Sequence, residues 1–192
     1  MTMIPLLVVA GLVVLVLLWG VAIFNRLVRL RVNCDNGWSQ IDVQLKRRYD
    51  LIPNLVETVK GYAGHEKGTL ESVVNARAKA MSVGASAGAA AHAEAEGLLG
   101  AALGKLIALA EAYPDLKANQ NFKALQEELA TTENKIGFAR QHYNDCVGQY
   151  STAIQQFPSN IVAGMFSFKP REYFELNEAA QREAPKVSFS NP

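Results

Sequence analysis

The sequence contains three histidines, the residue type most often used as a metal ligand or acid–base catalyst near neutral pH. His65, His92 and His142 lie in different segments and fit neither H-E-x-x-H nor the Glu-x-x-His pattern that holds iron in helical bundles. The two cysteines, Cys34 and Cys146, are too few and too widely spaced for a disulfide framework or a zinc site. The sequence also lacks a nucleophile elbow, a phosphate-binding loop and a dinucleotide fingerprint. We therefore expect no catalytic activity and no metal or other cofactor.

One group of polar side chains could form a buried charged cluster. Its members are Arg48, Glu133, Asn134, Arg140 and Asn144. Arg48 occupies an apolar position of one helical pattern, while Glu133 and Arg140 are seven residues apart beside the apolar seam of another. Because a buried charge is costly unless it is paired, we expect Arg48 to pair with Glu133 across two helices. We interpret the cluster as a structural network that fixes helix register, with a functional pocket as the alternative.

A long helix over residues 119–158 is expected to position this cluster. Apolar residues recur there every seven positions in two rows, which is the a/d pattern of a coiled coil. The first row is Phe122, Leu129, Ile136, Tyr143, Tyr150 and Phe157, and the second is Leu125, Thr132, Ala139, Cys146 and Ala153. Asn119 is a candidate N-cap and Pro158 a stop signal. Such a helix is about 55 Å long, so other long helices must lie along it.

The N-terminal segment predicts a membrane anchor. Ile4 to Phe24 contains no charged residue, and this length crosses a hydrocarbon core as a helix. We expect an anchor and not a cleaved leader, because no basic residue precedes the segment and no small-residue cleavage pattern follows it. Arg26, Arg29 and Arg31 come directly afterwards. Basic residues favour the inner side of a membrane, so we predict an N-terminus outside and a cytoplasmic bundle.

Two further helices are predicted between the anchor and the long helix. The apolar period over residues 36–81 indicates a second long helix that bends at Pro53, with a break or a change of direction near Gly64. The pattern leaves open whether this helix is continuous with the anchor. An Ala/Gly/Ser-rich turn at residues 83–88 then leads to a third helix over residues 90–112. With 19 basic and 18 acidic residues, the balanced charge argues against a nucleic-acid-binding protein.

The chain after Pro158 is rich in apolar residues. The candidate interaction residues there are Ile161, Met165, Phe166, Phe168, Tyr173 and Phe174. This segment either packs back onto the bundle or forms an exposed surface for a partner. Because an anchor raises the local concentration in the membrane, we expect homo-oligomers to form through this segment and the exposed helix faces.

Several blocks of sequence, in one order, resemble the LemA family of bacterial membrane proteins. They are RRYDLIPNL at residues 47–55, AYPDLKAN at 112–119, TENKI at 132–136, ARQHYN at 139–144 and FP at 157–158. The resemblance extends over nearly the whole chain. It implies an N-terminal anchor, a cytoplasmic antiparallel bundle of long helices and no established enzymatic activity. A member of this family is associated with magnetosome formation, which suggests a role in membrane organisation.

The sequence therefore predicts an all-α protein with an N-terminal transmembrane helix followed by an antiparallel helical bundle. The expected domains are an anchor at residues 1–25, a basic juxtamembrane segment at 26–35, the bundle at 36–176 and a tail at 177–192. We expect a single-pass scaffold or adaptor in the bacterial inner membrane, in contact with the lipid bilayer and an unidentified membrane protein. The alternatives are a bundle that binds a small ligand or metal and a regulator of a membrane protease.

Overall fold

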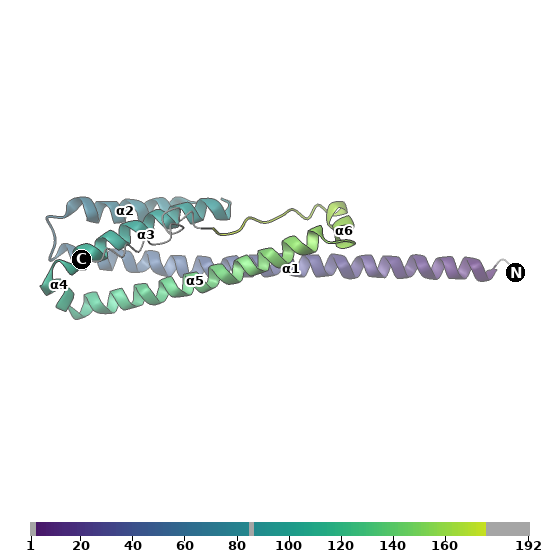
Figure 1. Cartoon of the computed structure of the whole chain (residues 1–192), viewed down its shortest axis with the longest axis horizontal. Coiled ribbons are helices and arrows are strands. Elements are labelled where there is room, and N and C mark those ends of the chain that lie inside the picture. Colours follow the sequence, from purple (N-terminus) through teal and green to yellow (C-terminus); the bar gives the residue numbers. More distant parts are fainter. Residues whose placement is uncertain (1–2, 85–86, 176–192) are drawn as a thin grey trace, which may run out of the picture. The chain divides into compact units, whose positions relative to one another are not determined.

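The computed structural model describes residues 3–84 and 87–175, so the predicted tail at residues 177–192 lies outside the described residues. The described part of the chain is helical and contains no strand, which confirms the all-α prediction (Figure 1). Its helices are α1 (Met3–Lys60), α2 (Lys67–Ser82), α3 (Ala89–Glu111), α4 (Pro114–Ala118), α5 (Gln120–Gln155) and α6 (Ser159–Met165).

Helix α1 is longer than the sequence pattern indicated. It continues without interruption from Met3 through the apolar segment to Lys60, a span of 58 residues and about 87 Å. The expected break near Gly64 is present within residues 36–81, because the first part of this segment belongs to α1 and the last part forms α2. Pro53 is accommodated inside α1, and the break falls where Gly61 and Gly64 lower helix propensity.

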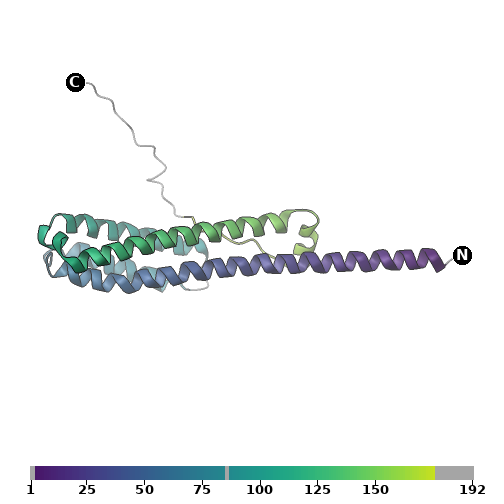
Figure 2. The same ribbon diagram turned by 90° about the horizontal axis from the view of Figure 1, so that it is seen from below.

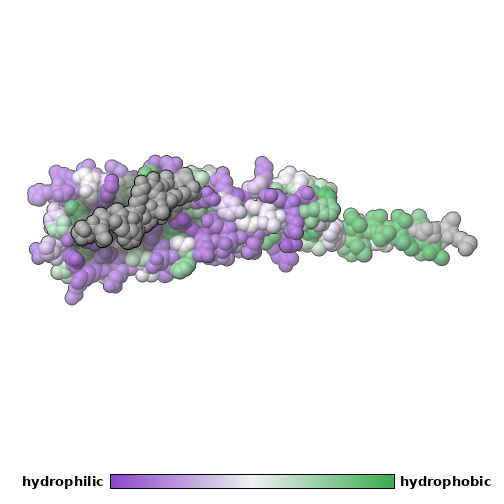
Figure 3. All heavy atoms as spheres, in the orientation of Figure 1, coloured by the Kyte–Doolittle hydropathy of each residue, from purple (hydrophilic) through white to green (hydrophobic). Residues whose placement is uncertain are grey.

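The N-terminal part of α1 is long and apolar enough to cross a membrane. Only 6% of its most apolar stretch is buried within the structure, and side chains such as Leu6, Leu12 and Leu18 are exposed. Figure 3 shows this exposed stretch as a continuous hydrophobic surface. A helix in the core of a soluble protein would bury these side chains, so the exposure is that expected of a membrane span.

The chain divides into two compact units, and α1 and α5 contribute to both. Unit 1 contains α1 up to Lys46, α5 from Thr132, α6 and the chain as far as Tyr173. Its buried side chains come from the facing stripes of α1 and α5 and include Leu27, Cys34, Ile41, Ile136, Tyr143, Val147, Tyr150 and Ile154. The predicted seam of the long helix is thus confirmed here, except that Phe157 is 75% exposed because α5 ends at Gln155.

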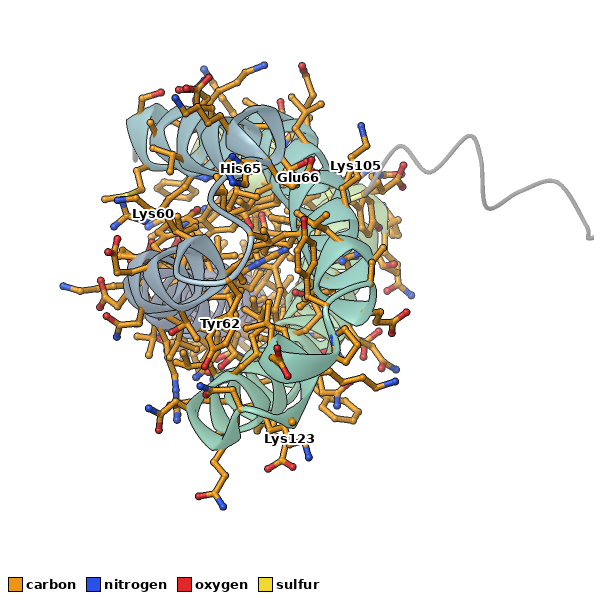
Figure 4. The ribbon with its side chains drawn as sticks, turned by 90° about the vertical axis from the view of Figure 1, so that its left-hand side faces the viewer. Lys60, Tyr62, His65, Glu66, Lys105 and Lys123 are labelled. Atoms are coloured by element: carbon orange, nitrogen blue, oxygen red, sulfur yellow. The ribbon has the colours of Figure 1, made fainter. Side chains whose placement is uncertain are left out.

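Unit 2 contains residues 47–131 and the chain from Phe174. Its core is formed by α1, α2, α3, α4 and the start of α5, with Ile52, Val59, Val73, Leu99, Leu106, Leu116 and Phe122 among its members. Figure 4 looks onto one end of this unit, where Tyr62, His65 and Glu66 come from the segment between α1 and α2. The Nδ2 of Asn119 donates a hydrogen bond to the Tyr62 hydroxyl at 3.0 Å.

Asn119 is the N-cap of α5, as the sequence predicted. Its side-chain Oδ1 accepts a hydrogen bond of 3.0 Å from the backbone N–H of Phe122. This contact satisfies one of the free donors at the start of the helix.

Helix α6 ends in a Schellman motif. Ser167 adopts a left-handed conformation with φ 55°. The N–H of Phe168 donates to the carbonyl of Ala163 at 3.0 Å, and the N–H of Ser167 donates to the carbonyl of Gly164 at 3.3 Å. Ala163 and Phe168 occupy the two positions whose apolar contact commonly accompanies this motif, and both are buried. The motif turns the chain sharply after α6 and directs residues 168–173 back along unit 1.

Candidate functional site

A buried charged cluster lies in unit 2. Arg48 of α1 and Glu96 of α3 are only 4% and 5% exposed, and Arg48 Nη1 lies 3.1 Å from Glu96 Oε2. The Tyr49 hydroxyl donates a hydrogen bond to the other carboxylate oxygen, Oε1. Arg77 of α2 donates from Nε to the Tyr49 carbonyl at 2.8 Å. The cluster therefore links three helices, and the Glu96 carboxylate accepts hydrogen bonds through both oxygens.

Arg48 was predicted from the sequence to be a buried charge, whereas Glu96 was not among the predicted members of the polar cluster. A signal for Glu96 was present, because it shares the apolar face of α3 with Leu99, Leu103 and Leu106, all of which are buried. A carboxylate on an apolar face has to be paired, by the argument already applied to Arg48. Two opposite charges at apolar positions of different helices indicate a pair even without knowledge of the fold.

The other members of the predicted polar cluster lie in unit 1. Glu133 and Asn134 are exposed on α5, and Arg140 and Asn144 are half-buried. Arg48 lies in unit 2. The pairing of Arg48 with Glu133 stays a prediction.

The cysteines and histidines do not form an activated site in the described residues. His142 Nε2 lies 3.8 Å from Cys146 Sγ, one helical turn away on α5. A thiol–imidazole pair can generate a nucleophile, but only where the thiol pKa is lowered. Burial raises the pKa of the Cys146 thiol and also that of Cys34, so both stay protonated near neutral pH. Residues 3–84 and 87–175 contain no group of three His, Cys, Asp or Glu side chains that could hold a metal ion.

The C-terminal segment is fastened to unit 1 by specific contacts. The Tyr150 hydroxyl donates to the Lys169 carbonyl at 3.0 Å, and the Tyr143 hydroxyl donates to the Glu172 carbonyl at 2.9 Å. Arg171 forms an ion pair of 2.6 Å with Asp35 of α1. The segment therefore packs back onto the helices, which is one of the two outcomes expected from its apolar composition.

This packing divides the predicted interaction surface. Phe168 and Phe174 are buried, with 9% and 1% of their surface exposed. The side chains that remain exposed are Ile161, Met165, Phe166 and Tyr173. Figures 1 and 2 show that α6, which precedes this segment, lies beside α1 in both views.

Unit 1 has an apolar groove between α1 and α6. The groove has a volume of about 500 Å³. One wall is formed by α1 between Val16 and Phe24, and the other by the chain between Pro158 and Phe166. The rings of Phe24 and Phe166 contact each other with centroids 4.7 Å apart.

A second groove lies between α1 and α5 in the same unit. It has a volume of about 580 Å³, and Val43 of α1 and Phe138 of α5 are among the residues that line it. These two side chains are 63% and 72% exposed, although the remaining α5 surface is mostly polar. Val43 and Phe138 thus give this groove an exposed apolar lining.

Comparison with known proteins places these features in a family. The family model described as the LemA family matches residues 37–189, which include most of the helical region. This chain belongs to the LemA family. The resemblance inferred from the sequence blocks is therefore confirmed.

Individual relatives of this LemA-family chain are distant. It is 25% identical to magnetosome protein MamQ 2 of Paramagnetospirillum magneticum over 179 residues, covering 81% of this chain and 66% of the relative. It is 24% identical to magnetosome protein MamQ of Magnetospirillum gryphiswaldense, with the same coverage. Protein LemA of Metamycoplasma hominis is 24% identical over 167 residues, covering 87% of this chain and 75% of the relative. The chain thus spans just under two thirds of the length of the magnetosome relatives. Family membership and the exposed apolar part of α1 together support a membrane-associated protein.

Proposed function

We propose that this protein is a single-pass scaffold or adaptor that holds partner proteins at the cytoplasmic face of the bacterial inner membrane. The observation that carries the proposal is the continuity of α1, which runs from the exposed apolar span directly into the core of unit 1. Leu27, Cys34 and Ile41 of the same helix are fully buried against that core. A partner bound to unit 1 is therefore held at a fixed distance from the membrane.

The groove lined by Val43 and Phe138 is the proposed partner surface. Val43 lies about 28 Å along the helix axis from Phe24, the end of the apolar segment, so a bound protein would sit close to the bilayer. The buried charged cluster is not part of this surface, because its carboxylate is occupied by Arg48 and Tyr49. The partner is a second copy of this chain or another membrane protein, and the former would give the homo-oligomers expected from the anchor.

Photo-crosslinking in native membranes tests this surface. A photoreactive amino acid at Val43 should give a defined adduct with a second copy or with another membrane protein. We expect Phe138→Asp to abolish the adduct, because a charge in the groove would be desolvated on binding. Gln141→Asp is the matched control, since it adds the same charge at an exposed α5 position outside the groove lining. Absence of an adduct, or equal adducts in both variants, would count against the proposal.

The proposed orientation follows from the positive charges. Arg26 and Arg29 are exposed directly after the apolar segment, which favours the cytoplasmic side for everything that follows. Cys34 is fully buried and cannot report on orientation, so the test uses Asn36→Cys, an exposed position two residues further on. A membrane-impermeant maleimide should label this variant only after the cells are permeabilised. Labelling in intact cells would reverse the assignment.

A further inference from the structure

Helix α6 carries exposed apolar side chains beside the membrane span. Ile161, Met165 and Phe166 are 55%, 75% and 58% exposed, and Phe157 just before the helix is 75% exposed. Figure 3 shows hydrophobic surface gathered at the position of α6, next to the exposed part of α1. Such a concentration of large apolar side chains at one end of a unit is typical of a surface that contacts a membrane or another protein.

The position of the groove along α1 indicates which of the two this surface contacts. The α1 wall, Val16 to Phe24, covers about 12 Å of helix axis and belongs to the C-terminal half of the apolar segment. If that segment spans the roughly 30 Å hydrocarbon core, this wall lies within the inner leaflet. Because the Phe166 ring contacts the Phe24 ring, with centroids 4.7 Å apart, the facing wall lies at the same depth, where the surrounding medium is lipid.

The backbone of the segment is suited to this environment. Polar backbone groups are costly in a membrane unless they are hydrogen-bonded within the protein. The N–H groups of Ile161, Phe166 and Phe168 donate to carbonyls of Pro158, Val162 and Ala163, all within the same short segment. The α6 turn therefore meets part of its hydrogen-bonding requirement internally, including the Schellman closure at its end.

The charges flanking the segment match the adjacent head-group layer. Arg26 and Arg29 follow the span on α1, and the exposed Lys169 follows α6. Arg31 lies over the Phe168 ring with its guanidinium carbon 5.3 Å from the ring centroid. Aromatic and basic residues at one level are typical of the boundary between hydrocarbon and head groups.

We propose that α6 is a second membrane contact, which inserts Phe157, Ile161, Met165 and Phe166 into the inner leaflet so that lipid acyl chains fill the groove against α1. This inference rests on the proposed anchor function of α1. It fixes unit 1 to the bilayer at two points in the sequence, the end of the span and the chain after α5. Lipid, and not a partner protein, then covers most of the exposed apolar surface of the C-terminal segment.

Spin-label accessibility in the full-length protein reconstituted into phosphatidylcholine–phosphatidylglycerol vesicles tests this inference. Nitroxides are placed singly at Met165, at Leu15 in the span and at Asn121 on the exposed start of α5, with the native cysteines replaced by alanine. Oxygen concentrates in hydrocarbon and a nickel chelate stays in water, so their ratio of collision rates reports depth. We expect Met165 to favour oxygen at least tenfold over the Asn121 position, as Leu15 does.

The accessibility results test the second membrane contact and the anchor separately. High nickel accessibility at Met165 would place α6 in water and overturn the inference, and low accessibility to both reagents would place it in a protein interface with the same result. If Leu15 reports lipid and Met165 does not, the anchor stands and only the second contact fails. If Leu15 also reports water, the anchor itself is wrong. Ile161→Cys provides a second α6 position should the Met165 label disturb the turn.

Discussion

Removal of the Glu96 carboxylate should destabilise unit 2 strongly. The Arg48–Glu96 pair is almost completely buried, with Nη1 and Oε2 3.1 Å apart and side-chain exposures of 4% and 5%. In Glu96→Ala the guanidinium of Arg48 stays in the core without this carboxylate, and the Tyr49 hydroxyl loses its acceptor. Breaking a buried pair from one side costs about 3–5 kcal/mol, far more than the net value of the intact pair.

Thermal unfolding of the detergent-solubilised full-length protein, followed by circular dichroism, measures this effect. A loss of this size corresponds to a fall in Tm of about 6–20 °C for a protein of this length. Glu94→Ala is the matched control, since it lies on the same helix and makes the same change in helix propensity. The Glu94 side chain is 73% exposed and its Oε1 lies 3.8 Å from Lys79 Nζ, so we expect a loss of stability below about 0.5 kcal/mol.

A double-mutant cycle distinguishes the loss of the Arg48–Glu96 interaction from a general destabilisation of α3. Arg48→Met removes the charge left behind, so the double variant with Glu96→Ala should lose clearly less stability than the sum of the two single losses. Equal Tm values for Glu96→Ala and Glu94→Ala, or simple additivity in the cycle, would refute the reasoning. The same cycle with Glu133→Ala tests the predicted Arg48–Glu133 pairing.

Three further predictions concern unit 1. Tyr143→Ala should lower the free energy of unfolding by about 3 kcal/mol in the same melting assay, because it leaves a cavity beside Trp38 and removes the hydrogen bond to the Glu172 carbonyl. An unchanged Tm would contradict the burial of Tyr143 in the apolar seam of α5. Gly37→Leu should lower the free energy of unfolding by about 1–3 kcal/mol, because even a Cβ at this position would lie 3.2 Å from the Tyr143 Cα. Gly137→Leu is the control, since a Cβ there meets open space and the substitution should stabilise the protein by up to about 1 kcal/mol. Similar effects of the two substitutions would rule out close helix packing at Gly37. Burial raises the folded pKa of the Cys34 thiol above 9.0, so its contribution to stability is complete below pH 9.0 and is lost as the pH rises through the folded pKa. In denaturant titrations, the free energy of unfolding of Cys34→Ala should therefore fall less steeply above this pH than that of the unchanged protein, and parallel curves would disprove the linkage.

The helices and the long apolar N-terminal segment could be predicted because they depend on local patterns. An unbroken run of apolar residues indicates the apolar part of α1, and a seven-residue repeat of apolar residues indicates the buried stripe of α5. The N-cap at Asn119 was equally local, since the side chain and the N–H that it satisfies are three residues apart. Each of these features depends on one stretch of the chain, so it can be predicted without knowing what packs against that stretch.

Features that depend on distant contacts were decided only by the tertiary structure. Arg48 had to have a carboxylate partner, but the sequence offered several, and packing of α3 against α1 selected Glu96, 48 residues away. The break near Gly64 was expected, yet the pattern alone did not show that residues 25–60 continue the apolar segment as one helix. The C-terminal aromatic residues looked alike in sequence, and the Schellman turn after α6 divided them by burying Phe168 while leaving Phe166 against the span. A periodic pattern defines which face of a helix is apolar, whereas the identity of the surface that covers this face depends on the path of the whole chain.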